Sequence, residues 1–356
     1  MRFFRGLVLF TIVALITFYI LDKKDIEPDE AIERISHMIT QKKNEIADKS
    51  VPENIIGNQK FQGEIYQWIG KNTSELLAAI GEPIRKDLSS YGYTWWVYTN
   101  HKTQYIQFGI LDDRIVTVFA TGKDIKIEPL SIGATYESVN TELQFANEVT
   151  YNQDISSYTF QLDKEDMRMR PLVKVTNDLF LQLYFDTFTN ELSSIRLMTG
   201  DMLLKQRPYG LRYRGELPES IVLSDDEWKK VEYGMEQQIF DLTNIIRYRF
   251  QKDSLVWEDK VSEVAFLHSK DMAENHYFSH YSQNGDGLKE RLDKEDVNYF
   301  AAGENIAAQY IDAPAAVEGW LNSEGHREAL LHDDYTHLGV GVYHLYYTQN
   351  FLTKPF

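Results

Sequence analysis

Imidazole and carboxylate side chains are concentrated in the C-terminal part of this 356-residue chain. Seven of its nine histidines lie between His268 and His344. Two imidazoles and a carboxylate from separate loops can bind a divalent ion, and three protein ligands would leave one position open for water. The chain contains no cysteine, which excludes disulfides, thiolate metal sites and a cysteine nucleophile. The C-terminal part is therefore where we look for a functional site.

Helical and strand patterns surround these histidines. One helix is expected from about residue 227 to residue 250, and a second follows Trp257. The apolar face of this second helix contains Val261, Ala265, His268 and Met272. His268 is therefore expected to be a packed, hydrogen-bonded core residue. The stretches 338–342 and 346–352 are expected to form a closing hairpin of two strands.

Five short motifs follow one another over residues 236–356. They are Asn244-x-x-Arg247, Phe278-Ser279-His280, Gly303-Glu304-Asn305-Ile306-Ala307, Trp320-x-x-Ser323-x-Gly325-His326-Arg327 and Gly339-x-Gly341-Val342. Each motif is weak alone, but the set in this order resembles the bacterial branch of the CAP (SCP-like) family of cysteine-rich secretory and pathogenesis-related proteins. The resemblance implies an α-β-α sandwich with a central cleft, which in this family carries two histidines and usually two acidic residues.

The resemblance also assigns residues to the cleft. His280 matches the first histidine, Glu304 the first acidic residue and His326 the second histidine. The second acidic position falls at residues 322–323, which are Asn and Ser here, so the chain departs from the family pattern. Glu324 lies one or two positions away and is a candidate replacement.

Two kinds of site remain open for these residues. His280, His326 and Glu304 could hold a divalent metal such as zinc, weakly and exchangeably, or they could form a hydrogen-bonded cluster without metal. Glu304 could instead be a buried carboxylate that holds loop amide groups. Asn305 is expected to bond backbone in a tight loop, and Ser323 is expected to cap the turn that carries His326.

An internal duplication is predicted upstream, in residues 58–203. The copies begin at Ile69-Gly70 and Ile132-Gly133, and each start precedes a short helix and then strands rich in aromatic and β-branched residues. The second copy is expected to carry a longer middle hairpin around Asp163 to Arg170. This stretch resembles the CAP-associated N-terminal domain of Gram-positive bacterial proteins and is interpreted as a binding or spacer module.

The N-terminus indicates export. Arg2 and Arg5 precede an uncharged apolar run over residues 6–21, which is typical of a secretory signal or a signal anchor. No small-residue cleavage site follows the run, so an uncleaved single-pass anchor is favoured over a secreted form. The basic flank would stay in the cytoplasm, leaving the rest of the chain outside.

The predicted fold class is α+β. The predicted organisation is a membrane anchor (1–21), a charged spacer (22–57), a duplicated helix-plus-antiparallel-sheet domain (58–203), a linker (204–235) and a CAP domain (236–356) that folds independently. The net charge of −17 argues against nucleic acid as a partner.

Three functions are open: capture of an envelope ligand such as a lipid, glycan or peptide, metal-dependent hydrolysis in the same cleft, and a structural envelope role. Because a metallohydrolase needs a general base besides its metal ligands, and only Glu324 is at hand, binding is favoured.

Overall fold

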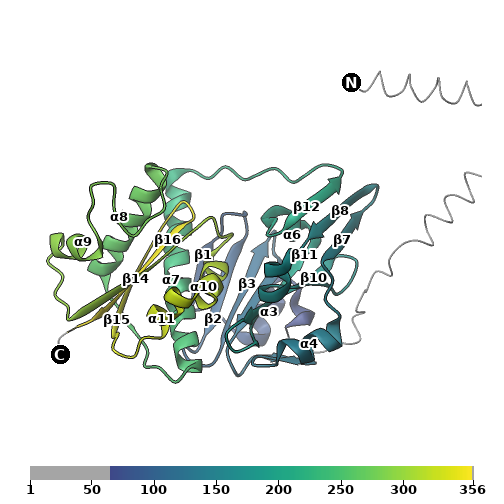
Figure 1. The fold of residues 1–356 in the computed structure, drawn as a ribbon. Coiled ribbons are helices and arrows are strands. Elements are labelled where there is room, and N and C mark those ends of the chain that lie inside the picture. Colours follow the sequence, from purple (N-terminus) through teal and green to yellow (C-terminus); the bar gives the residue numbers. More distant parts are fainter. Residues whose placement is uncertain (1–64, 355–356) are drawn as a thin grey trace, which may run out of the picture. The chain divides into compact units, whose positions relative to one another are not determined.

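Residues 65–354 are described in this computed structural model, and they form two modules that follow each other along the chain (Figure 1). We refer to residues 65–214 as the upstream module and to residues 225–354 as the C-terminal module. The predicted anchor (1–21) and spacer (22–57) lie outside the described residues. Within residues 65–354, no helix is both long enough and apolar enough to cross a bilayer.

A seven-stranded antiparallel sheet forms the body of the upstream module. Across the sheet, its strands are β1 (Arg85–Leu88), β2 (Thr94–Thr99), β3 (Tyr105–Leu111), β4 (Arg114–Thr121), β11 (Glu191–Thr199), β10 (Leu179–Asp186) and β9 (Leu172–Lys174). A smaller sheet has the order β12 (Gly210–Arg214), β8 (Ser156–Gln161), β7 (Glu148–Gln153). The remaining elements are η1 (Tyr66–Trp68), α3 (Thr73–Ile80), β5 (Lys126–Ile127), β6 (Leu130–Ser131), α4 (Tyr136–Leu143), α5 (Lys164–Met169) and α6 (Gly200–Gln206).

The two predicted copies begin with the same local geometry. Gly70 and Gly133 have φ values of 85° and 87°, a region that favours glycine. The amide of Gly70 donates to the carbonyl of Ile115 and that of Gly133 to the carbonyl of Leu192, both at 2.8 Å. Helices α3 and α4 follow directly, and the last strands of the two copies, β4 and β11, pair in the middle of the sheet.

Two predictions for this module were wrong in detail. The stretch around Asp163 to Arg170 is helix α5 and not a hairpin, because Asp163 accepts hydrogen bonds from the amides of Glu165 and Asp166 and so caps a helix. The predicted linker is largely structured as well. Its residues 210–214 form β12, which pairs with β8, and α7 already begins at residue 225.

The C-terminal module is a four-stranded sheet with helices on both faces. The strand order is β13 (Val256–Trp257), β15 (His337–Tyr343), β16 (Tyr346–Thr353), β14 (Ala301–Ala308), which leaves β14 at an edge. Its helices are α7 (Asp225–Arg249), α8 (Asp259–Glu274), α9 (Leu288–Lys294), α10 (Ala313–Leu321) and α11 (Glu324–Leu331). The mixed α/β class agrees with the prediction.

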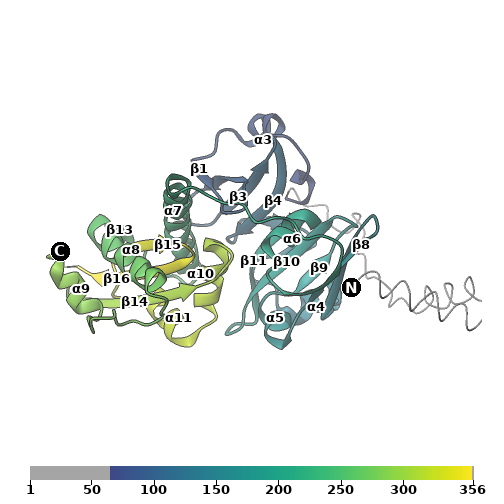
Figure 2. The same cartoon turned by 90° about the horizontal axis from the view of Figure 1, so that it is seen from above.

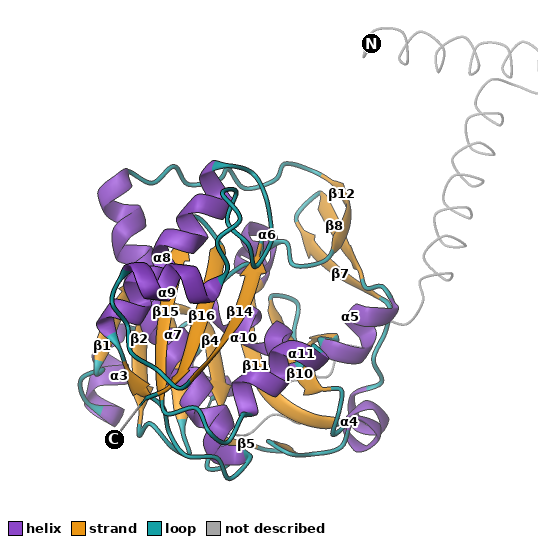
Figure 3. Ribbon diagram, turned by 60° about the vertical axis from the view of Figure 1, so that its left-hand side comes forward, coloured by secondary structure: helices purple, strands orange, loops and turns teal. Residues whose placement is uncertain are grey.

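Side-chain alternation along β15 separates the two helical layers. A Cβ atom on Gly339 or Gly341 would lie within 2.3 Å of the α8 backbone, so these glycines face α8. Val340 and Val342 belong instead to the core cluster that contains residues of α7 and α10. Figure 3 shows α8 and α9 on the near side of β15 and β16. Edge strand β14 is therefore reachable from both layers.

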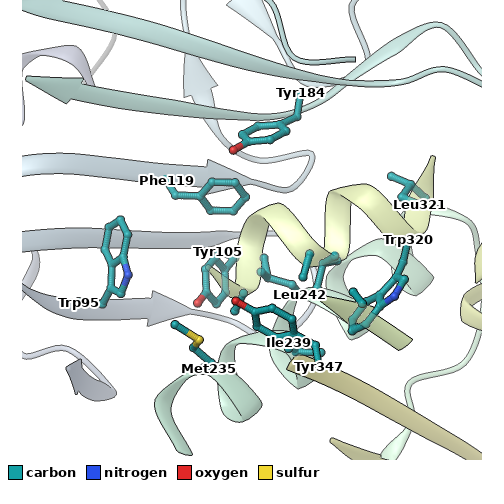
Figure 4. Packing of buried hydrophobic residues seen from close by; sticks show 14 of the residues in the cluster. Trp95, Tyr105, Phe119, Tyr184, Met235, Ile239, Leu242, Trp320, Leu321 and Tyr347 are labelled. Carbon is teal, nitrogen blue, oxygen red and sulfur yellow. The ribbon is translucent and has the colours of Figure 1, made fainter. Parts of the chain in front are cut away.

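One hydrophobic core joins the two modules. Trp95, Phe119 and Tyr184 of the upstream sheet belong to the same buried cluster as Met235 of α7 and Trp320 of α10 (Figure 4). Figure 2 shows α7 beside β1, where the guanidinium of Arg85 binds Asp241 of α7 at 3.1 Å. The upstream sheet is thus part of the environment of α7 and α10.

Candidate functional site

The three residues that the resemblance assigns to a cleft come from three kinds of element. His280 lies in the loop between α8 and α9, Glu304 on edge strand β14, and His326 in the first turns of α11. The expectation of three loops was therefore correct for His280 alone. Because β14 is an edge strand, a loop from the α8 side and a helix from the α10 side can both approach it.

His280 and Glu304 form a direct pair. The Nδ1 atom of His280 lies 2.9 Å from Oε1 of Glu304. The His280 side chain is 50% exposed, whereas that of Glu304 is 4% exposed. The carboxylate is thus a buried anchor, and it orients an imidazole whose other nitrogen, Nε2, has no protein partner among the described residues.

Arg291 completes this pair and was not predicted. Its Nη2 donates to Oε2 of Glu304 at 2.5 Å, so both carboxylate oxygens are engaged. Its Nη1 donates to the carbonyls of His280 at 3.0 Å and Asp286 at 3.2 Å. One guanidinium therefore fixes both the carboxylate and the loop that carries His280. The contact is made across 13 residues, and no sequence pattern indicates it.

His326 approaches from the other side of β14. Its Nδ1 lies 2.9 Å from Oγ of Ser323, and its carbonyl accepts a hydrogen bond from Nδ2 of Asn305 at 3.0 Å. Burial lowers the pKa of His326, and the charge of His280 lowers it further. The two imidazoles thus act on each other electrostatically, with no hydrogen bond between them.

Ser323 and Asn305 have roles close to those expected. Ser323 occupies the N-cap position of α11, but its hydroxyl contacts the His326 ring and makes no capping bond to a backbone amide. Asn305 does bond backbone, although from a buried position in β14 and not from a loop. Both residues therefore help to hold His326.

The positions of these side chains can be compared with the predicted metal site. No group of three or more His, Asp or Glu residues within residues 65–354 is placed to hold a metal ion. Glu304 already binds His280 and Arg291, and Glu324 is exposed on the first turn of α11 without a side-chain partner in the described part of the chain. The Nε2 atoms of His280 and His326 make no hydrogen bond to any residue of 65–354. Metal binding stays a prediction, with two imidazoles as the available ligands.

Other residues of the motifs hold the fold. His268 is buried as predicted, and its Nε2 lies 3.0 Å from the carbonyl of Ser279. Asn244 makes two hydrogen bonds with the backbone of Leu255, and Arg247 donates to the carbonyls of Leu330 and three other residues that follow α7 or α11. The Asn-x-x-Arg motif therefore ties α7 to later segments.

Exposed aromatic side chains lie close in sequence to the His280–Glu304 pair. Phe278 and Tyr281 flank His280 and are 55% and 65% exposed, and Phe300, directly before β14, is 75% exposed. Such apolar exposure next to a polar pair is typical of a binding surface. Exposed aromatic side chains and an oriented imidazole thus lie in neighbouring segments of the chain.

Comparison with known proteins identifies both modules. Residues 69–209 match the CAP-associated N-terminal family, and residues 240–353 match the cysteine-rich secretory protein family. The uncharacterized membrane protein YlbC of Bacillus subtilis (strain 168) is 49% identical over 290 residues, 82% of this chain and 84% of that protein. The uncharacterized protein YkwD of the same strain is 33% identical over 121 residues, 33% of this chain and 47% of that protein.

Two solved structures support the same family assignment. An extracellular protein containing an SCP domain from Bacillus anthracis is 45% identical, with a TM-score of 0.78, and the match covers 82% of this chain and 95% of that one. A cysteine-rich secretory protein from Staphylococcus aureus is 25% identical, with a TM-score of 0.74, and the match covers 85% and 97%. The chain therefore belongs to the cysteine-rich secretory protein (CAP) family and carries a CAP-associated N-terminal module in front of its CAP module.

Proposed function

We propose that this protein captures a ligand of the bacterial cell envelope in the cleft formed by His280, Glu304 and His326. The observation that carries the proposal is the His280–Glu304 pair, in which a buried carboxylate orients a half-exposed imidazole at 2.9 Å. An imidazole held in this way and left open on its other nitrogen is suited to contact a ligand.

The ligand class follows from the surroundings of the pair. Phe278, Tyr281 and Phe300 supply exposed aromatic surface, on which a lipid chain, a sugar ring or an apolar peptide side chain could lie. A divalent ion would be held by the Nε2 atoms of His280 and His326. In that arrangement Glu304 orients a metal-binding histidine through its other ring nitrogen and is not itself a ligand.

Hydrolysis in the same cleft is the alternative. It would need a carboxylate free to take a proton, and both oxygens of Glu304 are engaged by His280 and Arg291. Glu324 has a free carboxylate, but it lies exposed on α11 and no contact joins it to the other cleft residues. These two observations favour binding over hydrolysis.

Zinc titration of the full-length protein in detergent, followed by calorimetry, tests the cleft. We expect weak uptake by the wild type, lost in the double variant His280→Ala/His326→Ala and weakened as the pH falls through about 6.5, where free imidazoles become protonated. His276→Asn, which removes an exposed histidine from the same loop, is the matched control and should keep wild-type uptake.

Equal zinc uptake by wild type and double variant would refute the ligand assignment. The same proteins should then be compared for binding to lipid vesicles, peptidoglycan fragments and a peptide library. We expect one of these classes to bind the wild type at least tenfold more tightly than the double variant. A chromogenic ester and a peptide substrate test hydrolysis, and turnover that depends on His280 would favour the alternative.

We further propose that the protein is held in the membrane by residues 1–21, with residues 22–356 outside. The proposal is supported by the basic flank and apolar run at the N-terminus and by the relative that is named as a membrane protein. Protease added to protoplasts should digest residues 22–356. Full protection of this region would contradict the topology, and a soluble form beginning near residue 22 would indicate cleavage.

A further inference from the structure

The turn between α10 and α11, which leads to His326, is bound to the upstream module by Asn322. The Oδ1 atom of Asn322 accepts a hydrogen bond from the amide of Thr187 at 2.7 Å. Its Nδ2 atom donates to the carbonyls of Phe185 at 3.0 Å and Glu318 at 3.0 Å. Both halves of this amide are thus used to join the turn to the end of β10.

Arg327, directly after His326, makes a second connection to the same place. Its two terminal nitrogens bind the two carboxylate oxygens of Asp186, each at 2.9 Å. Its guanidinium also lies 4.8 Å from the ring of Phe188 and 4.9 Å from that of Phe250. Such a bidentate ion pair fixes the orientation of the Arg327 guanidinium as well as its distance from Asp186.

Asp186, the last residue of β10, is itself held firmly. Its side chain is 1% exposed, and its Oδ1 accepts hydrogen bonds from the amides of Phe188 at 3.0 Å and Thr189 at 3.4 Å. The guanidinium of Arg249 lies 4.0 Å from its other oxygen. The carboxylate therefore presents Arg327 with a fixed partner and not with a mobile surface charge.

His326 lies between these two connections. Asn322 and Arg327 are bound to the upstream module, and Ser323, next to Asn322, contacts Nδ1 of the His326 ring at 2.9 Å. We propose that the end of β10 and the turn that follows it (residues 185–189) position His326 in the cleft, through Asn322 and Arg327. The inference deepens the proposed function, on which it rests, and makes Asp186 a positioning residue of the cleft.

Asn322 is one of the two positions, with Ser323, at which the resemblance places the second acidic residue. A carboxylate there could accept from the amide of Thr187 but could not donate to the carbonyl of Phe185. Only an amide side chain of this length makes both contacts. Asn322 is used here to join the modules.

The test follows the His326 ring by NMR in full-length protein with ¹⁵N-labelled histidine, in detergent and at fixed pH. The ring ¹⁵N shifts report which nitrogen carries the proton and which is hydrogen-bonded. We expect Asp186→Asn and Asn322→Asp each to shift the His326 nitrogens toward the values of a free imidazole. Two variants are used so that misfolding of one leaves the other informative.

Asp312→Asn is the matched control. Asp312 forms a further buried ion pair between the modules, with Arg196 at 2.7 Å, and asparagine keeps its capping role on α10. A general loosening of the interface should disturb this variant as well. Unchanged His326 shifts in both test variants, or equal shifts in Asp312→Asn, would overturn the proposal. The readout needs no ligand, so it stays decisive even if the cleft binds nothing.

Discussion

Glu304 is a buried carboxylate with a nitrogen partner on each oxygen. Removing an isolated carboxylate from water is costly, and the guanidinium of Arg291 together with the imidazole of His280 offsets that cost through direct hydrogen bonds. Because Arg291 also binds the carbonyl of His280, the three residues form a closed unit. The orientation of the His280 imidazole thus depends on a residue outside the family motifs.

A pH-dependent stability is expected from His268. Burial lowers the pKa of His268 in the folded protein. In the unfolded chain, the imidazole takes up a proton at about pH 6.5. Below that pH the unfolded state binds more protons, so the free energy of unfolding falls as the pH is lowered. His268→Gln, whose amide can donate to the Ser279 carbonyl, should show a smaller fall between about pH 7.5 and about pH 5.5.

Urea unfolding of the two proteins at both pH values measures this difference. Burial also lowers the pKa of His326 and of His337, so the variant should keep part of the pH dependence. Parallel curves for wild type and variant would show that His268 contributes nothing to it. His276→Asn, at an exposed position, should behave as the wild type does.

The sequence could identify the candidate site residues that belong to motifs, and not the residues that hold them in place. His280, Glu304 and His326 could be named because they stand inside short, ordered patterns. Asp186 could not, because it meets Arg327 across 141 residues and only the folded chain brings them together. The same holds for Arg291, whose contacts depend on how α9 packs.

At the scale of elements, the glycines of β15 set how closely α8 can pack on the sheet. A Cβ on Gly341 would lie 1.9 Å from the amide nitrogen of Phe266, and one on Gly339 would lie 2.2 Å from that of Ser262. Backbone atoms cannot move aside as a flexible side chain can. The Gly-x-Gly spacing therefore places two residues without side chains on the face of the strand that meets α8.

Gly341→Ala should lower the free energy of unfolding by about 1–3 kcal/mol or more, because α8 must move away from the sheet. Gly325→Ala is the matched control, since its added methyl group would meet nothing within 4 Å. In helix α11 this change should be neutral or stabilising, by up to about 1 kcal/mol. Chemical denaturation of both variants measures the difference, and similar losses would contradict the packing argument.

Elements with a strong local pattern were predicted well. The helix expected from residue 227 to 250 is α7, at residues 225–249, and the expected closing hairpin is β15 and β16. Helix α5 was missed because Asp163 and Asp166 form its capping box in place of the usual Ser/Thr and Glu. Strand β12 was missed because its partner β8 lies about 50 residues earlier, which no local pattern shows.

At the scale of the whole molecule, sequence patterns placed a domain boundary where the structure has a continuous core. The apolar face of α7 is buried against the upstream sheet, and Arg196 of that sheet forms a fully buried ion pair with Asp312 of α10. Glu318 of α10 likewise accepts hydrogen bonds from Ser193 and Ser194 of β11. The pattern of apolar and polar residues within one helix or strand cannot reveal that a distant part of the chain packs against that element.

The expectation that the CAP module folds alone is therefore replaced by the opposite prediction. Residues 225–356, expressed without the upstream module, would expose the buried faces of α7 and α10. They would also lose the ion pair between Arg196 and Asp312 and the hydrogen bonds that Glu318 accepts from Ser193 and Ser194. We expect this segment to bind a hydrophobic dye and to melt without a cooperative transition. Residues 54–356, whose described part (65–354) belongs to one compact unit, should unfold in a single cooperative step. Calorimetry of both segments decides the matter, because a cooperative transition in the short segment would show that the upstream sheet is dispensable for folding.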